Sequence, residues 1–150
     1  MANVSAMCSS FKSEILKGIH ALGTSVVRAG TGADTIKAAL YLASASRGAG
    51  DTVYSSTGEV TGTGYTAGGV SVTNATAPST SGTTGIWTPS ASIVFPSVTL
   101  SAFDAALLYN STQGDKAISV HNFGSQTVTA GTFTLSMPVH DSSNALIRIG

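Results

Sequence analysis

The histidines and the single cysteine are the residues whose chemistry could support catalysis or metal binding. Histidines stand at positions 20, 121 and 140, and Cys8 has no second cysteine to pair with. No two histidines have the His-x-x-x-His spacing of a metal site, and no serine lies in the G-x-S-x-G elbow of a hydrolase. We therefore predict no catalytic residues, no metal ligands, no cofactor and no enzyme activity, and expect Cys8 to be a small apolar side chain that is buried or partly exposed.

His140 and Asp141 are adjacent in the stretch PVHDSSN, which has the composition of a turn. We expect Asp141 to accept hydrogen bonds from backbone amides in a surface turn. A small hydrolase that uses both residues is the alternative. His121 is expected on a strand, either exposed or packed at an interface.

Five glycines lie within the twelve residues GEVTGTGYTAGG, at positions 58–69. A phosphate-binding loop would need a lysine and a hydroxyl residue after its glycines, at the start of a helix. Here no lysine follows, and the next residues, VSVTNAT, alternate like a strand. The glycines are therefore predicted to let the chain turn tightly, with Tyr65 packing across the turn.

The composition limits the classes of partner. The chain has 150 residues, of which 9% are charged, with seven basic and seven acidic side chains. An ordinary domain has roughly 25% charged residues, so this surface must be built largely from Ser, Thr, Asn and Gly. The basic residues are scattered singly, which argues against nucleic acid as a partner. No apolar run is long enough to cross a membrane and no signal peptide is visible, so we expect a soluble protein made in the cytoplasm.

These residues must be positioned by short elements. The spacing of apolar residues predicts one amphipathic helix over 10–23, after an N-terminal arm over 1–9. A β-rich body over 34–150 completes a single domain, 1–150. Polar stretches at 44–69 and 74–84 are expected to be long loops. Strands are predicted near 35–44, 68–76, 85–89, 92–95, 103–110, 116–123, 131–138 and 144–149.

The spacing of these strands favours a mainly β fold, an antiparallel β-sandwich or a jelly-roll-like arrangement, with one short N-terminal helix and long Gly/Ser/Thr-rich loops. The clearest alternation is GTFTLSMP at 131–138. There Phe133, Leu135 and Met137 are expected to face inward, and the intervening Thr and Ser residues to face outward.

Taken in order, several segments resemble small virion proteins of tailed bacteriophages. The matching segments are SFKSEILKGIH, IKAALYLASA, GEVTGTGYTAGG, GTTGIW, ALLYNSTQGDKAISVHNFGSQTV, GTFTLSMP and NALIRI. The resemblance implies a non-enzymatic component of the virion, with the major capsid protein or other virion proteins as partners. A capsid decoration (cement) protein that binds between major capsid subunits is the leading hypothesis, and a homo-oligomer is expected.

The candidate interface residues are Phe11, Ile15, Tyr54, Tyr65 and Trp87. Aromatic and large apolar side chains of this kind often anchor protein interfaces. For Phe11, Ile15 and Trp87, an ordinary place in the core is the alternative. A tail, baseplate or fibre component that acts as an adhesion or carbohydrate-binding module is the second functional hypothesis, in which Tyr54, Tyr65 and Trp87 would stack on sugar rings.

Overall fold

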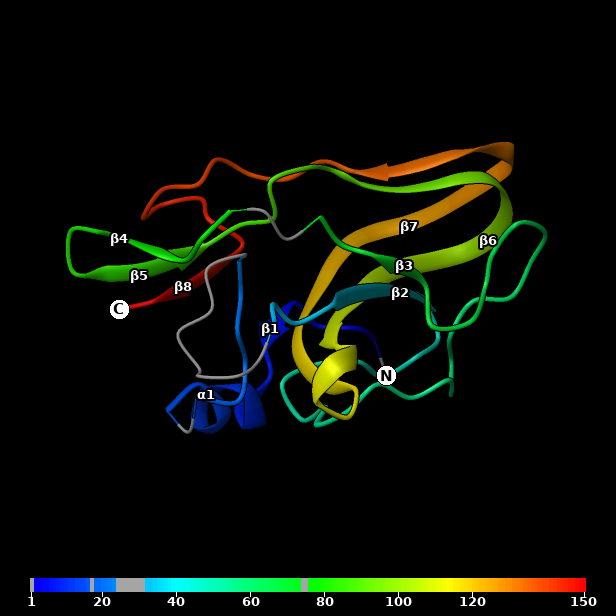
Figure 1. Cartoon of the computed structure of the whole chain (residues 1–150). Coiled ribbons are helices and arrows are strands. Elements are labelled where there is room, and N and C mark those ends of the chain that lie inside the picture. Colours follow the sequence, from blue (N-terminus) through cyan, green and yellow to red (C-terminus); the bar gives the residue numbers. More distant parts are fainter. Residues whose placement is uncertain (1, 17, 24–31, 74–75) are drawn as a thin grey trace.

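The computed structural model describes residues 2–16, 18–23, 32–73 and 76–150, which form a mainly β structure (Figure 1). Every strand pairing among them is antiparallel. The predicted antiparallel, sandwich-like fold with one short α-helix is therefore confirmed. In chain order the elements are β1 (Ala6–Met7), α1 (Ser9–Leu16), β2 (Ile36–Leu42), β3 (Val70–Ser71), β4 (Ser79–Ser81), β5 (Thr84–Trp87), β6 (Ile93–Asn110), the 3-10 helix η1 (Ser111–Gln113), β7 (Lys116–Leu135) and β8 (Ile147–Ile149).

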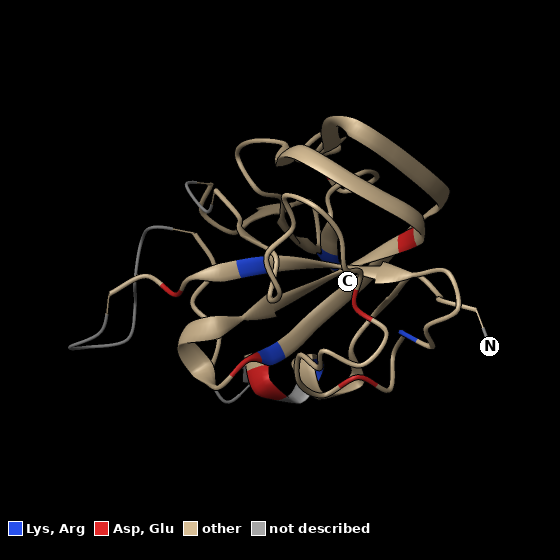
Figure 2. Ribbon diagram, turned by 90° about the vertical axis from the view of Figure 1, so that its right-hand side faces the viewer, with Lys and Arg blue, Asp and Glu red and all other residues tan. Residues whose placement is uncertain are grey.

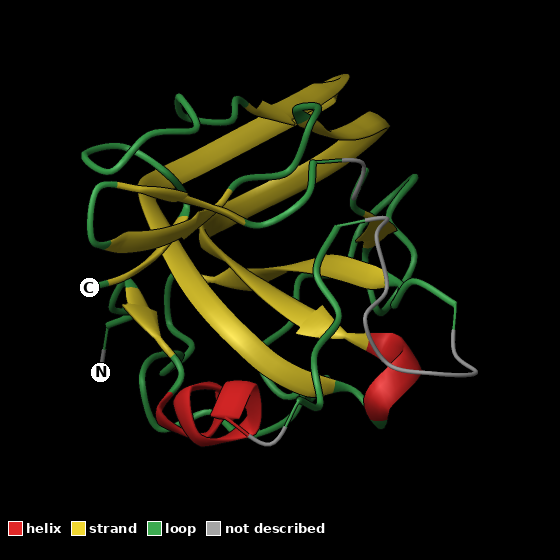
Figure 3. Ribbon diagram, turned by 60° about the vertical axis from the view of Figure 1, so that its left-hand side comes forward, coloured by secondary structure: helices red, strands yellow, loops and turns green. Residues whose placement is uncertain are grey.

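The strands form two sheets, a larger one in the order β1-β7-β6-β2-β3 and a smaller one in the order β4-β5-β8. Strands β6 and β7 make one hairpin of 18 and 20 residues. Residues 93–100 of β6 and 128–135 of β7 bend back over the rest of the larger sheet, and we call this part the ribbon (Figure 1). Both helices lie at the bottom of Figure 3, and the ribbon lies at the opposite end of the molecule.

The hairpin bends because its two strands are bulged. The pairing register between β6 and β7 shifts four times between Phe95 and Ala105. Ser97 and Ala102 have positive φ angles of 54°, and Ala130 has one of 46°. A bulge bends a strand while most of its hydrogen bonds are kept. The prediction of separate strands at 92–95 and 103–110, and at 116–123 and 131–138, is therefore wrong.

The core lies between the ribbon and the sheet beneath it. The ring of Phe133 lies 4.8 Å from that of Phe103 and 5.2 Å from that of Phe123. Phe133, Leu135 and Met137 pack against this core, as the alternation predicted, while Thr132 and Thr134 are exposed.

Helix α1 is shorter than predicted. It ends at Leu16, and Gly18 adopts a left-handed φ of 67°. The Ile19 amide donates to the Glu14 carbonyl (3.0 Å) and the Gly18 amide donates to the Ile15 carbonyl (2.9 Å), which is the Schellman arrangement that ends helices. The predicted end at Gly23 is therefore wrong; residue 17 lies outside the described residues.

The polar segments differ in structure. Residues 44–69 form no strand, as predicted, although Val53 makes an isolated bridge with Lys116. The segment predicted as a loop over 74–84 contains β4 and the first residue of β5, which pair through a turn at Gly82, so that prediction is wrong for 79–81 and for Thr84. Residues 74 and 75 lie outside the described residues.

The N-terminal segment lies against the body. Asn3 is 5% exposed, and its amide nitrogen donates to the Asp104 carboxylate. Its side-chain oxygen accepts from the Arg47 amide at 2.8 Å. Strand β1 then pairs with β7. The described part of the predicted arm, from residue 2, is thus bound to its own chain; residue 1 is not among the described residues.

Candidate functional site

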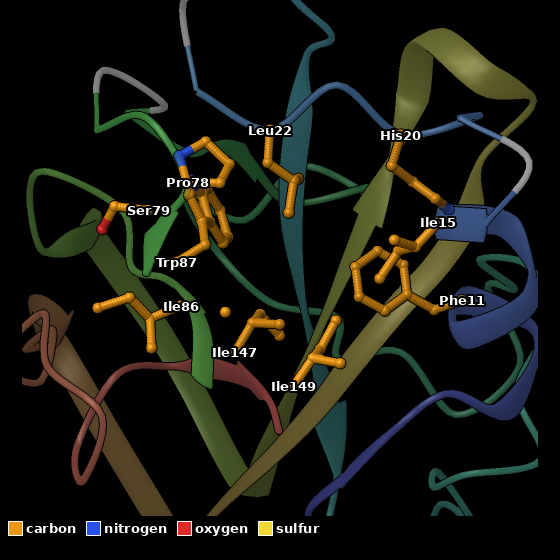
Figure 4. Close-up of a pocket in the computed structure, with 11 residues that line it drawn as sticks. Phe11, Ile15, His20, Leu22, Pro78, Ser79, Ile86, Trp87, Ile147 and Ile149 are labelled. Carbon is orange, nitrogen blue, oxygen red and sulfur yellow. The ribbon is translucent and has the colours of Figure 1, made fainter. Parts of the chain in front are cut away.

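An apolar pocket lies between helix α1 and the smaller sheet (Figure 4). Its volume is about 190 Å³, which is room for one apolar side chain or a small apolar molecule. Three of the five predicted interface residues contribute to its wall: Phe11, Ile15 and Trp87. The complete lining is Phe11, Ile15, His20, Leu22, Pro78, Ser79, Gly85, Ile86, Trp87, Ile147 and Ile149.

The two largest of these side chains belong to the core of the chain itself. Phe11 is 0% exposed and Trp87 is 1% exposed. The indole nitrogen of Trp87 donates to the Thr76 carbonyl at 3.0 Å, and Trp87 pairs with Ile147 across β5 and β8. Phe11 and Trp87 are buried and form the floor of the pocket. Its accessible apolar residues are the half-buried Ile15 and Leu22 and the exposed Pro78 and Ile149.

A polar cluster behind the pocket fixes helix α1. The ring nitrogen Nε2 of His20 lies 2.8 Å from one Glu14 oxygen, and Lys116 Nζ donates to the other at 2.8 Å. Burial lowers the pKa of His20, although Glu14 opposes that shift. Burial alone would raise the pKa of Glu14, but the hydrogen bonds from Lys116 and His20 bring it below its ordinary value.

The second nitrogen of His20 is also occupied. The Asn110 amide nitrogen lies 3.2 Å from His20 Nδ1 and donates to Asp34 at 2.7 Å. Because Asn110 Nδ2 can only donate, His20 Nδ1 is the acceptor, and the proton on Nε2 is donated to Glu14. Neither nitrogen is free to accept a proton from a substrate. The cluster therefore positions the helix against the start of β7.

Sequence reasoning missed this cluster. Glu14 and Lys116 are 102 residues apart, and no spacing in the sequence relates them. Asn110 has a second role, because its side chain caps η1 by accepting from the amides of Thr112 and Gln113. An asparagine followed by a short polar turn was the one local signal.

The other two predicted interface residues meet at Glu59. The hydroxyls of Tyr54 and Tyr65 donate to the Glu59 carboxylate at 2.6 and 2.7 Å. The Gly68 amide donates to the same carboxylate at 2.8 Å. Burial, followed by these bonds to Glu59, raises the pKa of both tyrosines far above the ordinary value. The tyrosines therefore bind the 58–69 stretch to the sheet.

The glycines of this stretch allow close contact between backbones. A Cβ atom on Gly64 would overlap the Ser97 carbonyl, and one on Gly69 would overlap the Ala38 carbonyl. Both glycines also have positive φ, of 76° and 69°. Tight turning and the packing of Tyr65 across the turn are therefore confirmed.

The three aromatic residues expected on one sugar-binding surface do not form one. Trp87 is in the core, and the hydroxyls of Tyr54 and Tyr65 are bound to Glu59. The ring of Tyr54 is stacked on that of Tyr109, with centroids 4.8 Å apart.

Asp141 forms the predicted turn. Its carboxylate accepts from the amides of Ser143 and Asn144 at 2.8 and 2.7 Å, and the hydrogen bonds from these two residues lower its pKa. His140 instead lies with Nε2 3.0 Å from the Ser79 hydroxyl. These contacts give no arrangement in which Asp141 orients His140 for catalysis.

The remaining titratable candidates are packed side chains. Cys8 is 0% exposed, and burial raises the pKa of its thiol to about 12, in agreement with the expected apolar role. His121 is half-buried, its Nε2 lies 2.8 Å from the Ser119 hydroxyl, and desolvation lowers its pKa to about 4. Among the residues that the structure describes, no three or more His, Cys, Asp or Glu side chains are grouped to hold a metal ion.

Charged residues are separated from the ribbon. Residues 60–103 and 117–139 contain no Asp, Glu, Lys or Arg, and the ribbon lies entirely within them. In Figure 2 the bent-back part of the hairpin, in the upper part of the view, has no blue or red segment. Its exposed residues are Val94, Pro96, Ser97, Thr99, Thr129, Ala130, Thr132 and Thr134. We call this surface the ribbon face.

No protein-family model, curated protein or solved structure matches the chain. Of the helices in the described residues, none has the length and apolar character required to span a bilayer.

Proposed function

We propose that this chain is a non-enzymatic structural protein of a bacteriophage virion, a decoration protein that binds between major capsid subunits. Its site of action would be the virion, after synthesis in the host cytoplasm. The single observation that carries the proposal is the uncharged ribbon face, which complements the resemblance noted in the sequence.

The ribbon face suits permanent association with other proteins. Covering a charged side chain costs far more free energy than covering a hydroxyl that finds a partner. The ribbon face offers threonine hydroxyls and Val94, which is 43% exposed, and no charged group must be desolvated. Interfaces are depleted of charged residues at their centre for this reason.

The apolar pocket supplies a second feature that fits an assembly partner. Its accessible apolar residues include Ile15 on α1 and Ile149 on β8, and its floor is already buried. A single apolar side chain of a capsid subunit would fill it without rearrangement of the chain. Of the predicted interface residues, this leaves Ile15 as the one that would contact a partner directly.

The test is co-sedimentation of the purified chain with capsids of its phage assembled without it. Val94→Lys places a charge on the ribbon face and should weaken binding roughly tenfold or more, which corresponds to about 1.4 kcal/mol or more. Val53→Lys is the matched control because Val53 is 46% exposed but lies in the 44–69 loop. It should bind like the unmodified chain.

Three outcomes decide the proposal. Loss of binding for Val94→Lys alone supports the ribbon face. Loss for Val53→Lys alone would move the contact to the 44–69 loop. No capsid binding by the unmodified chain would contradict the decoration role and leave the tail, baseplate or fibre role to be tested on those structures.

A further inference from the structure

Strand β7 has an open edge along the ribbon. On one side it pairs with β6 over its whole length. On the other side β1 pairs with it only at Ser119 and Val120, and beyond position 122 no described residue pairs with that edge. Proteins usually protect such an edge with charged residues or proline. Residues 125–137 contain neither.

The apolar side of this edge is incompletely covered. Phe123, Phe133, Leu135 and Met137 pack against the core but remain partly exposed. A hollow of about 90 Å³ lies beside them, and its lining includes Phe123, Leu135 and Met137 together with His121. A further strand paired with this edge of β7 would cover the exposed part of these apolar side chains.

The edge is compatible with a second copy of itself. In a two-fold contact, the same surface of each copy meets the other, so any charged group near the axis meets its own kind. Residues 131–135, the last five of β7, carry no charge and follow Ala130, the last residue of β7 with a positive φ. The register shift opposite them lies between Phe95 and Val98 of β6, where Ser97 has a positive φ. This run is therefore a neutral strand edge that a copy of the same run can match.

We propose that β7 of one chain pairs antiparallel with β7 of a second copy, centred on Phe133. In this register Thr132 faces Thr134 of the copy, in both directions, and the two Phe133 residues face each other. Cross-strand threonine pairs and aromatic pairs are among the favourable pairs in sheets. Thr132 and Thr134 also belong to the ribbon face, but the contact is made through the backbone edge of β7, and the proposal does not depend on the virion assignment.

The test is the mass of the purified chain by sedimentation velocity over a range of concentrations. The unmodified chain should sediment at twice the mass of one chain. The double variant T132K/T134K sets lysine opposite lysine twice and should sediment as a monomer. The double variant T132K/T134E has as many charged substitutions, but sets lysine opposite glutamate twice, and should remain a dimer.

A monomeric unmodified chain would overturn the proposal. So would equal behaviour of the two double variants, because only the stated register distinguishes them. Circular dichroism verifies that both are folded. A second readout is disulfide formation between a Thr132→Cys chain and a Thr134→Cys chain, which should cross-link with each other faster than either does with itself. Cys8 is buried and should not compete.

Discussion

Glu59 holds the 58–69 stretch to the sheet through a single carboxylate. It accepts from two tyrosine hydroxyls and one backbone amide. Glu59→Gln keeps the shape but replaces one acceptor oxygen with a donor, which leaves a buried group unsatisfied. We expect the free energy of unfolding to fall by about 2 kcal/mol. Urea denaturation measures it, with Thr57→Ala on the exposed part of the same loop as the control. An equal, small effect of both changes would contradict this role.

His121 should make stability depend on pH. Its pKa is lowered from 6.5 to about 4 by desolvation, so the folded chain binds fewer protons than the unfolded chain between these values. Stability should therefore be complete above about pH 6.5 and fall as the pH is lowered towards 4. A pKa shift of this size corresponds to a loss of about 3 kcal/mol, and the partial exposure of the ring reduces it. The expected loss in the free energy of unfolding is therefore on the order of 1–3 kcal/mol.

Replacement of this histidine separates its effect from others. His121→Gln should make the fall in stability between pH 6.5 and 4 smaller, without removing it, because burial also lowers the pKa of His20. Glu14 and Asp141 have lowered pKa values and lose their contributions at more acidic pH. Denaturation midpoints across this pH range measure the difference. An unchanged slope in the variant would show that His121 does not titrate with folding.

At the scale of single residues, the sequence was informative where the signal was local. The turn of Asp141 follows from the residues beside it, and burial of Cys8 follows from its apolar character. The bonds of Tyr54 and Tyr65 to Glu59 depend on how the loop folds over the sheet. The contact between Glu14 and Lys116 depends on the whole topology, which no local spacing encodes.

Substitution of Gly62 tests whether the 58–69 stretch is held against strand β6. A Cβ atom there would overlap the Thr99 carbonyl, next to the backbone bond from the Thr99 amide to the Thr63 carbonyl. Gly62→Ala should therefore destabilise the chain by about 1–3 kcal/mol. Gly50→Ala is the control, because a Cβ atom at Gly50 meets nothing within 4 Å and neither glycine has a positive φ.

Hydrogen exchange would locate the effect of the Gly62 change. The Thr99 amide should lose protection in Gly62→Ala and keep it in Gly50→Ala. Equal stability of the two variants would mean that the loop is not held against β6 by this backbone contact.

Elements with clear alternation were predicted well, and continuous bulged strands were not. The inward positions of Phe133 and Leu135 follow from a period of two. The joining of 92–95 to 103–110 could not be predicted, because Ser97 and Ala102 take a left-handed conformation that their residue types rarely adopt. Polar residues within a bulge look the same in sequence as those in a turn.

At the scale of the whole molecule, charge and shape are organised together. The hairpin bends so that its neutral half becomes the ribbon at one end, while the polar cluster of Glu14, His20 and Lys116 fixes the helix at the other. The class of fold could be predicted from strand spacing. The separation of charged and uncharged ends could not, because it depends on where the hairpin bends.

The number of copies of this chain per virion tests the decoration role most directly. Quantitative mass spectrometry of purified particles gives its ratio to the major capsid protein, and an image reconstruction of the particle gives its position. We predict a fixed ratio to the major capsid protein and density for the chain at the junctions between capsid subunits. A few copies confined to the tail, or none in the particle, would contradict the account.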